Sequence, residues 1–141
     1  MNAVKRFIAF SGALLLSVFS LSLAFAQDSE GSNVPFTAQQ VESGSELYAA
    51  RCAACHGGEL GGMASFPALK GETFQGEWGA QGLEQLHIYI MENMPLGQAG
   101  VLTEEEYIDV LAFILSHNGV EAGDTELTAD VIADYEFPAA Q

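Results

Sequence analysis

The chain has 141 residues, and its nineteen acidic and four basic residues give a formal net charge of −15. This length suits one small domain. The charge excludes binding to nucleic acid or to an anionic membrane surface, and it favours partners that carry basic docking patches, although it also serves solubility alone.

The first 26 residues have the pattern of a secretory signal peptide. Two basic residues precede an uncharged apolar run over residues 7–23, and "AFA" at 24–26 forms an A-x-A cleavage site. We therefore expect an exported, periplasmic protein that is cleaved after Ala26, with an uncleaved N-terminal anchor as the alternative. Cleavage leaves Arg51 and Lys70 as the only basic residues, and no later segment is apolar enough to cross a membrane.

The rest of the chain divides into three parts by composition. Residues 27–36 form a polar lead, residues 37–119 form the folded domain, and residues 120–141 form an acidic C-terminal arm with scattered apolar side chains. We expect the arm to dock loosely on the domain, with a partly disordered solvating tail as the alternative.

Two capping boxes predict the first and last helices of the domain. Thr37 with Gln40 opens a helix that runs to about residue 51. Thr103 with Glu106 opens a helix that runs to residue 116 or 117, before the stop signal "NG" at 118–119. A middle helix follows from the apolar face made by Leu83, Leu86 and Ile90.

Between these helices, "RCAACHGG" places Cys52 and Cys55 three positions apart, with His56 directly after them. A disulfide would close a tiny loop and stabilise little. A thioredoxin-like redox pair needs a strand before it and a helix after it, which is not the order here, and a zinc site needs a fourth ligand. The fourth interpretation is covalent c-type haem, for which C-x-x-C-H is the attachment signature, and export with no other cysteine favours it.

An iron held by His56 needs a second axial ligand on the opposite face of the haem. Met94 directly precedes Pro95, so the helix ends there and the side chain is aimed more freely than in mid-helix. Met63 is too close to His56 along the chain, and Met91 is assigned to core packing. The residues therefore favour Met94 as the ligand.

The two remaining histidines keep a bis-His haem open as the alternative. His87 lies among apolar positions of the middle helix, where a partly buried or surface histidine is the ordinary outcome. His117 lies in the last turn of the final helix, where a histidine suits the negative helix end.

Taken together, these motifs resemble a single-haem class I cytochrome c. The resemblance covers roughly residues 37–119 and rests on "GSELYAARCAACHGG", "FPALKG", "YIMENMP" and "LTEEEYIDVLAFILSHNG". It implies an all-α, small cytochrome c fold in which the N- and C-terminal helices cross around a covalently attached haem. It also implies that Gly44 admits Tyr107 at the crossing, and that Met94 of the "MP" pair is the ligand.

The haem pocket is expected between the crossed helices. Phe66 and Leu69 are apolar enough to line a ring edge, and the resemblance implies that the Pro67 carbonyl accepts the N–H of His56. Trp78 is expected in a glycine-rich loop. The resemblance implies that its indole N–H reaches a haem propionate, and the alternative is a ring that covers the core. The predicted haem contacts are Cys52, Cys55, His56, Phe66, Pro67, Leu69, Trp78, Leu86, Ile90 and Met94.

A His–Met iron has no vacant site, which suits outer-sphere one-electron transfer and does not suit oxygen or peroxide chemistry. We therefore predict a periplasmic electron carrier with one haem c, not an enzyme. The narrower resemblance implies a quinoprotein alcohol or methanol dehydrogenase as the donor, and transfer toward a terminal oxidase or another cytochrome. The alternatives are a haem-based ligand sensor or peroxidase with a labile Met94, and a haem-free interaction module closed by a disulfide.

Overall fold

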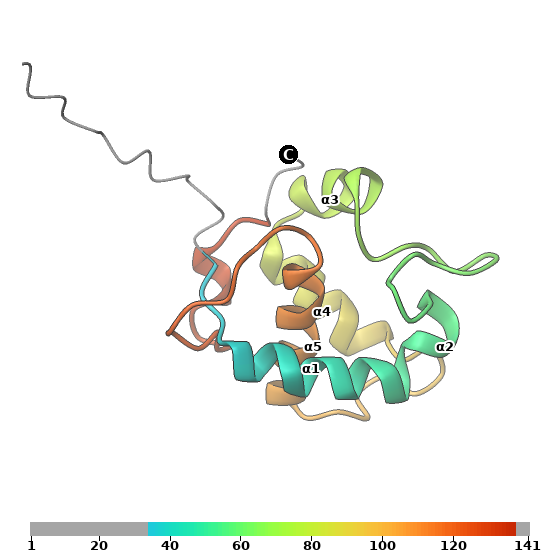
Figure 1. The fold of residues 1–141 in the computed structure, drawn as a ribbon, viewed down its shortest axis with the longest axis horizontal. Helices are drawn as coiled ribbons and strands as arrows, with labels where there is room; N and C mark the ends of the chain where they lie inside the picture. The colour runs from blue at the N-terminus through green and yellow to red at the C-terminus, as the bar shows by residue number, and fades with distance from the viewer. Residues whose placement is uncertain (1–33, 138–141) are drawn as a thin grey trace, which may run out of the picture.

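The structure, a computed structural model, describes residues 34–137. Its helices are α1 (Ala38–Arg51), α2 (Ala53–His56), α3 (Glu72–Gly79), α4 (Leu83–Asn93), α5 (Glu104–Ser116) and the short 3-10 helix η1 (Ile132–Asp134) (Figure 1). These residues contain two isolated bridges and no strand, so the predicted all-α fold is confirmed. The predicted signal peptide and residues 138–141 of the arm lie outside the described residues.

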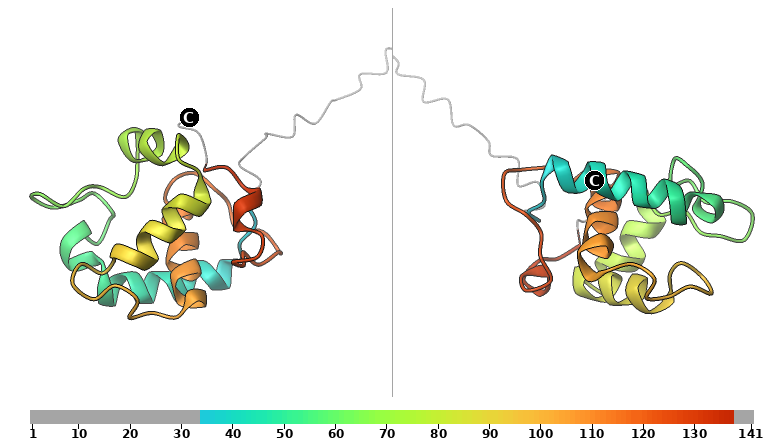
Figure 2. Two further views of the ribbon diagram at one scale, coloured as in Figure 1. Left: turned by 180° about the vertical axis from the view of Figure 1, so that it is seen from behind. Right: turned by 90° about the horizontal axis from the view of Figure 1, so that it is seen from below.

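Helices α1 and α5 cross and form the most extensive helix contact of the described chain (Figure 2). Both predicted capping boxes are present, with Thr37 and Thr103 as the N-cap residues. A Cβ on Gly44 would overlap the carbonyl oxygen of Asp109, so only glycine permits this approach. The nearest aromatic is Phe113 and not the expected Tyr107, because α5 crosses α1 near Asp109, at about the middle of the helix.

The chain on either side of the crossed helices completes the core. Val34 and Phe36, which precede the predicted domain start, are buried. The N–H of Gly123 donates to the carbonyl of Phe36 at 2.8 Å. The side chain of Gln40 donates to the carbonyl of Leu127 at 2.9 Å and accepts its N–H at 3.0 Å.

The arm therefore packs with specific contacts as far as residue 137. Its apolar side chains Leu127, Ile132 and Phe137 are buried. The ring of Phe137 meets that of Phe74 on α3 edge to face, with centroids 5.7 Å apart. None of the described helices is both long enough and apolar enough to span a bilayer.

Candidate functional site

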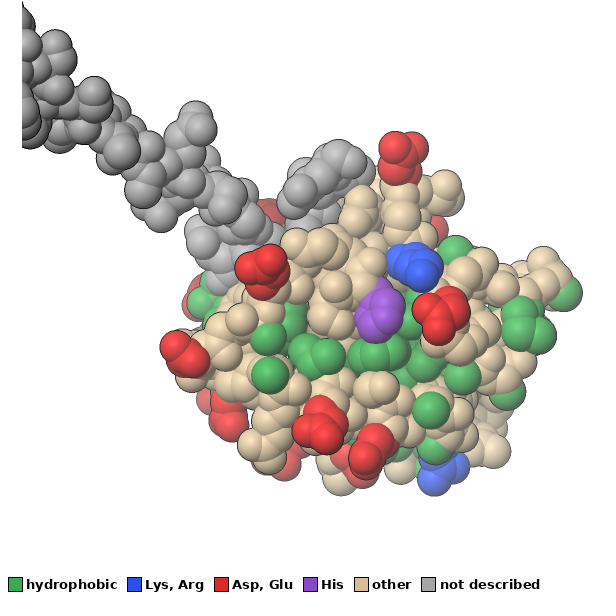
Figure 3. All heavy atoms as spheres, viewed as in Figure 1, with side chains coloured by type: hydrophobic (Ala, Val, Ile, Leu, Met, Phe, Trp, Pro, Cys, Tyr) green, Lys and Arg blue, Asp and Glu red, His purple; other side chains and the backbone are tan. Residues whose placement is uncertain are grey.

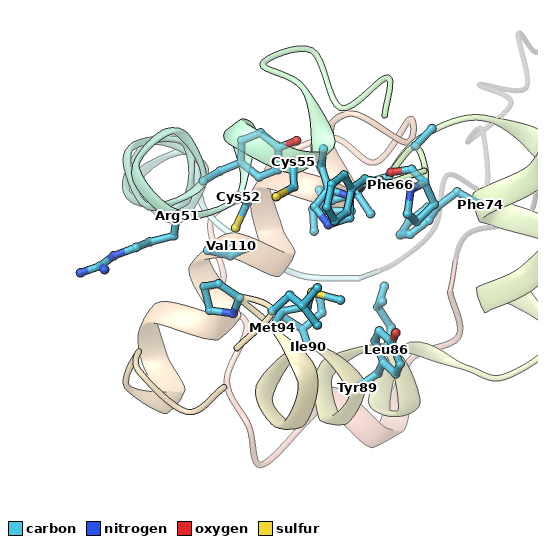
Figure 4. Close-up of a pocket in the computed structure, with 18 of the residues that line it drawn as sticks. Arg51, Cys52, Cys55, Phe66, Phe74, Leu86, Tyr89, Ile90, Met94 and Val110 are labelled. Atoms are coloured by element: carbon cyan, nitrogen blue, oxygen red, sulfur yellow. Dashed lines mark hydrogen bonds between the residues drawn. The ribbon is translucent and has the colours of Figure 1, made fainter. Parts of the chain in front are cut away.

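The domain encloses a cavity of about 590 Å³ between α1, α2, the segment that follows α2, α3, α4 and α5. This volume lies within the range of about 300–1,000 Å³ that is usual for ligand and cofactor sites. All ten residues that the sequence analysis predicted as haem contacts line it. Figure 4 shows Cys52 and Cys55 on one side of the cavity, with Met94, Ile90 and Leu86 facing them from α4. The structure thus brings together residues that are up to 42 positions apart in the sequence.

His56 ends the single turn of α2 and is nearly fully buried. Its Nδ1 lies 2.9 Å from the carbonyl oxygen of Pro67, which is the contact expected from the sequence. A carbonyl oxygen only accepts, so Nδ1 carries the hydrogen and a neutral ring keeps its lone pair on Nε2. That is the tautomer a metal-ligating histidine needs, with its ring held in place by the second nitrogen.

Met94 is the C-cap of α4 and leaves the helix with extended backbone, φ −124° and ψ 148°. This geometry is what Pro95 demands of the residue before it, as predicted. The side chain of Met94 lines the cavity, whereas Met63 is 52% exposed and Met91 packs on the core.

The histidines of the bis-His alternative lie away from the cavity. His87 is 4% exposed and belongs to the buried interior of the domain, more deeply buried than the sequence indicated. His117 is the C-cap of α5, where its Nδ1 lies 3.0 Å from the carbonyl oxygen of Phe113. Neither side chain lines the cavity, so the geometry supports Met94 over a second histidine.

The two cysteines are free thiols of intermediate burial. Burial and, to a smaller extent, the neighbouring Cys55 raise the pKa of Cys52 to about 11. Across residues 34–137, no three His, Cys, Asp or Glu side chains gather as a metal site, so the zinc interpretation gains no support.

The prediction that Trp78 lies in a loop is wrong, because residues 72–79 form α3. Phe74 and Trp78 lie four residues apart, so both rings bury on the same helix face and support the helix. A Cβ added at Gly76 or Gly79 would meet no atom within 4 Å, so packing does not require glycine at either position. Each glycine lowers the stability of the helix but does not interrupt it. Trp78 lines the cavity and packs on Tyr89 of α4, with ring centroids 5.2 Å apart.

Several residues that line the cavity were not predicted from the sequence, and Tyr48 is the most buried of them. Its hydroxyl donates to the carbonyl of Gly57 at 2.7 Å and so holds the chain directly after His56. Burial, and to a smaller extent Cys52, raises the pKa of Tyr48 to about 12. Its position could have been predicted from the spacing along the helix. Gly44, Tyr48 and Cys52 are four residues apart, so Tyr48 lies on the same helix face as the first cysteine of the motif.

Comparisons with known proteins agree with this geometry. Residues 39–114 match the family model described as cytochrome c oxidase, cbb3-type, subunit III. The chain is 36% identical over 86 residues to a thiosulfate dehydrogenase of Stutzerimonas stutzeri (strain A1501), and the match covers 55% of this chain and 27% of that protein. It is 37% identical over 81 residues to a thiosulfate dehydrogenase of Allochromatium vinosum, with 52% of this chain and 30% of that protein covered.

The fold is also similar to a solved structure. The crystal structure of the sulfane dehydrogenase SoxCD from Paracoccus pantotrophus superposes with a TM-score of 0.59 at 25% identity, over 75% of this chain and 61% of that one. The matched region spans less than a third of the length of both curated thiosulfate dehydrogenases. Because the family model matches more than half of the chain, over residues that include the C-x-x-C-H motif and Met94, the chain belongs to the c-type cytochrome family described as cytochrome c oxidase, cbb3-type, subunit III.

Proposed function

We propose that the chain is a one-electron carrier with a single haem c, attached through Cys52 and Cys55 and ligated by His56 and Met94, as in a class I cytochrome c. The observation that carries the proposal is the cavity that has the C-x-x-C-H motif on one side and Met94 on the other. When bound, the haem supplies a low-spin iron that cycles between Fe(III) and Fe(II).

His56 and Met94 would ligate the iron, and the apolar side chains around them would keep water away. The Pro67 carbonyl orients His56, and the backbone of Met94 is held by the hydroxyl of Tyr107 at 2.8 Å. Apolar side chains close the remaining wall, among them Leu86, Ile90, Val110 and Ile114. A site that changes little between two charge states suits outer-sphere transfer, so the proposal is a carrier and not an enzyme.

Electrons would enter and leave where apolar cavity residues reach the surface. Phe66, Tyr89 and Leu96 line the cavity and remain 36%, 44% and 73% exposed. On the face that Figure 3 shows, acidic side chains are spread over the surface and basic ones are few. A redox protein with a basic rim around an apolar contact would complement both features.

The donor and acceptor are proposed by class. The thiosulfate and sulfane dehydrogenases among the relatives favour a dehydrogenase that oxidises sulfur compounds as the donor, and the quinoprotein alcohol dehydrogenase expected from the sequence gains no support from them. The acceptor would be a terminal oxidase or another cytochrome. Both partners would meet the chain in the periplasm, if residues 1–26 direct export as their sequence predicts.

A second candidate function follows from the same relatives. The chain would then oxidise thiosulfate itself, and thiosulfate alone would reduce the purified protein. A carrier needs a separate donor, so the absence of reduction by thiosulfate would favour the first proposal.

The test is an absorption spectrum of the reduced, periplasmically matured protein with and without carbon monoxide, together with its intact mass. The proposal expects one covalent haem and a sharp low-spin spectrum that the gas leaves unchanged. A spectrum shifted by the gas would mean that Met94 is absent or labile, as in the sensor or peroxidase alternative. A colourless protein with the mass of the polypeptide alone would overturn the haem proposal, and a Cys52→Ala, Cys55→Ala double variant supplies the colourless control.

A further inference from the structure

Asn118 follows the end of α5 and is buried, with 5% of its surface exposed. Its side-chain oxygen accepts the N–H of Gly71 at 3.2 Å. Its side-chain nitrogen donates to the carbonyl of Leu69 at 3.0 Å and to that of Ile114 at 2.8 Å. One short side chain thus joins two segments of the domain that are almost fifty positions apart.

These three partners select an amide. Two carbonyl oxygens need donors and one N–H needs an acceptor, and asparagine supplies both from one short side chain. An aspartate would place a carboxylate against two carbonyl oxygens with no hydrogen to share, at the cost of leaving buried groups unpaired.

Backbone conformation does not explain the choice of asparagine at this position. Asparagine is common after helices because it tolerates a left-handed backbone. Here the residue with positive φ is Gly119, at +88°. The hydrogen bonds of its side chain, and not its backbone conformation, therefore explain why position 118 is an asparagine.

The segment that Asn118 holds forms one wall of the cavity. Pro67, whose carbonyl binds His56, lies two residues before Leu69. Helix α3 starts directly after Gly71, and the backbone carbonyl of Asn118 accepts the side-chain N–H of Gln75 on that helix at 3.1 Å. Among the described helices, α3 packs only on α4. The hydrogen bond between Gln75 and Asn118 therefore connects α3 to the end of α5.

We propose that Asn118 is a positioning residue of the haem site, which locks the cavity wall over residues 67–75 to the end of α5 and so fixes the Pro67 carbonyl that orients His56. This inference rests on the proposed function, since it assigns His56 to the iron. A firm hydrogen bond from Nδ1 to Pro67 makes the imidazole more electron-rich and favours Fe(III). Loosening that bond raises the reduction potential.

The experiment compares holoprotein variants in a fixed redox buffer. Asn118→Leu keeps approximately the size of the side chain and loses all three hydrogen bonds, and Asn118→Ala loses them together with the bulk of the side chain; neither variant adds charge. Ser116→Ala is the matched control, because its hydroxyl bonds only within the same helix end, to the Phe113 carbonyl at 2.7 Å. We expect both Asn118 variants to show a ratio of reduced to oxidised protein several-fold above wild type, and Ser116→Ala to keep the wild-type ratio.

An unchanged ratio in haem-loaded Asn118 variants would overturn the inference, even if their stability falls, because a purely structural residue lowers stability without moving the potential. If neither variant matures, amide hydrogen exchange at Gly71 in the wild-type holoprotein decides. Slow exchange supports the lock, and exchange as fast as in an open loop overturns it. A wild type without covalent haem would be a failure of the proposed function itself, and the spectrum taken first separates that case.

Discussion

The hydroxyl of Tyr107 donates a hydrogen bond to the carbonyl of Met94 at 2.8 Å, and its oxygen accepts the N–H of Gly100 at 2.9 Å. One buried side chain of α5 therefore holds both ends of the loop over residues 94–100. This loop carries the proposed second axial ligand, so its rigidity bears on whether the iron stays six-coordinate.

Tyr107→Phe is expected to loosen the loop while leaving the ring in the core. It removes both hydrogen bonds of the hydroxyl and leaves the Met94 carbonyl and the Gly100 N–H without this partner, which costs about 1–3 kcal/mol of unfolding free energy for each group left unpaired. The reduced variant should also bind carbon monoxide to a larger extent than wild type. Denaturant unfolding and a carbon monoxide titration measure the two effects, and a variant that matches wild type in both would show that the hydroxyl does not restrain Met94.

Gly44→Ala is expected to disturb the crossing of α1 and α5. The added methyl group would overlap the carbonyl oxygen of Asp109, and overpacking of this kind costs about 1–3 kcal/mol. Gly76→Ala is the matched control, because a Cβ there meets nothing within 4 Å and alanine is the better helix former. Thermal unfolding of the two variants should move in opposite directions, and equal shifts would contradict the packing argument.

Acid should destabilise the protein through His87. Burial lowers the pKa of His87, with Glu104 and Glu84 opposing the shift, and its Nε2 has no hydrogen-bond partner. The unfolded chain then binds the proton more readily, so the contribution of His87 is fully present above about pH 6.5 and is lost as pH falls from there through the folded-state pKa. His87→Leu should reduce the pH dependence of the unfolding free energy in that window. If the variant keeps the pH dependence of the wild type, a group other than His87 causes it.

The rate of electron exchange with small charged reagents should depend on the negative charge of the protein. The net charge of −15 attracts the cationic oxidant tris(1,10-phenanthroline)cobalt(III) and repels the anionic oxidant hexacyanoferrate(III). Stopped-flow oxidation of the reduced protein should slow with added salt for the cation and quicken for the anion, because ions screen both interactions. Rates with both reagents that are indifferent to ionic strength would contradict the proposal that charge guides docking.

The amino-acid sequence by itself determined the features that depend on near neighbours. Each capping box lies within four residues, the C-x-x-C-H motif within five, and the end of α4 is set by Pro95 directly after Met94. The crossed-helix fold and the covalent haem were predicted through the resemblance to a class I cytochrome c that these patterns carry, and the structure shows the crossing. Most of the predicted cavity contacts lie within the motifs that carry the resemblance, whereas Trp78 and Leu86 lie outside them.

Only the tertiary structure decided the contacts between distant segments. Local composition favoured a loop around Trp78, but burial of Phe74 and Trp78 on one face makes residues 72–79 a helix. The bonds of Asn118 to Leu69 and Gly71 join positions nearly fifty residues apart, and no spacing rule encodes them. The physical reason is that such contacts depend on how separate helices pack, whereas caps and attachment motifs form from groups that the chain already holds side by side.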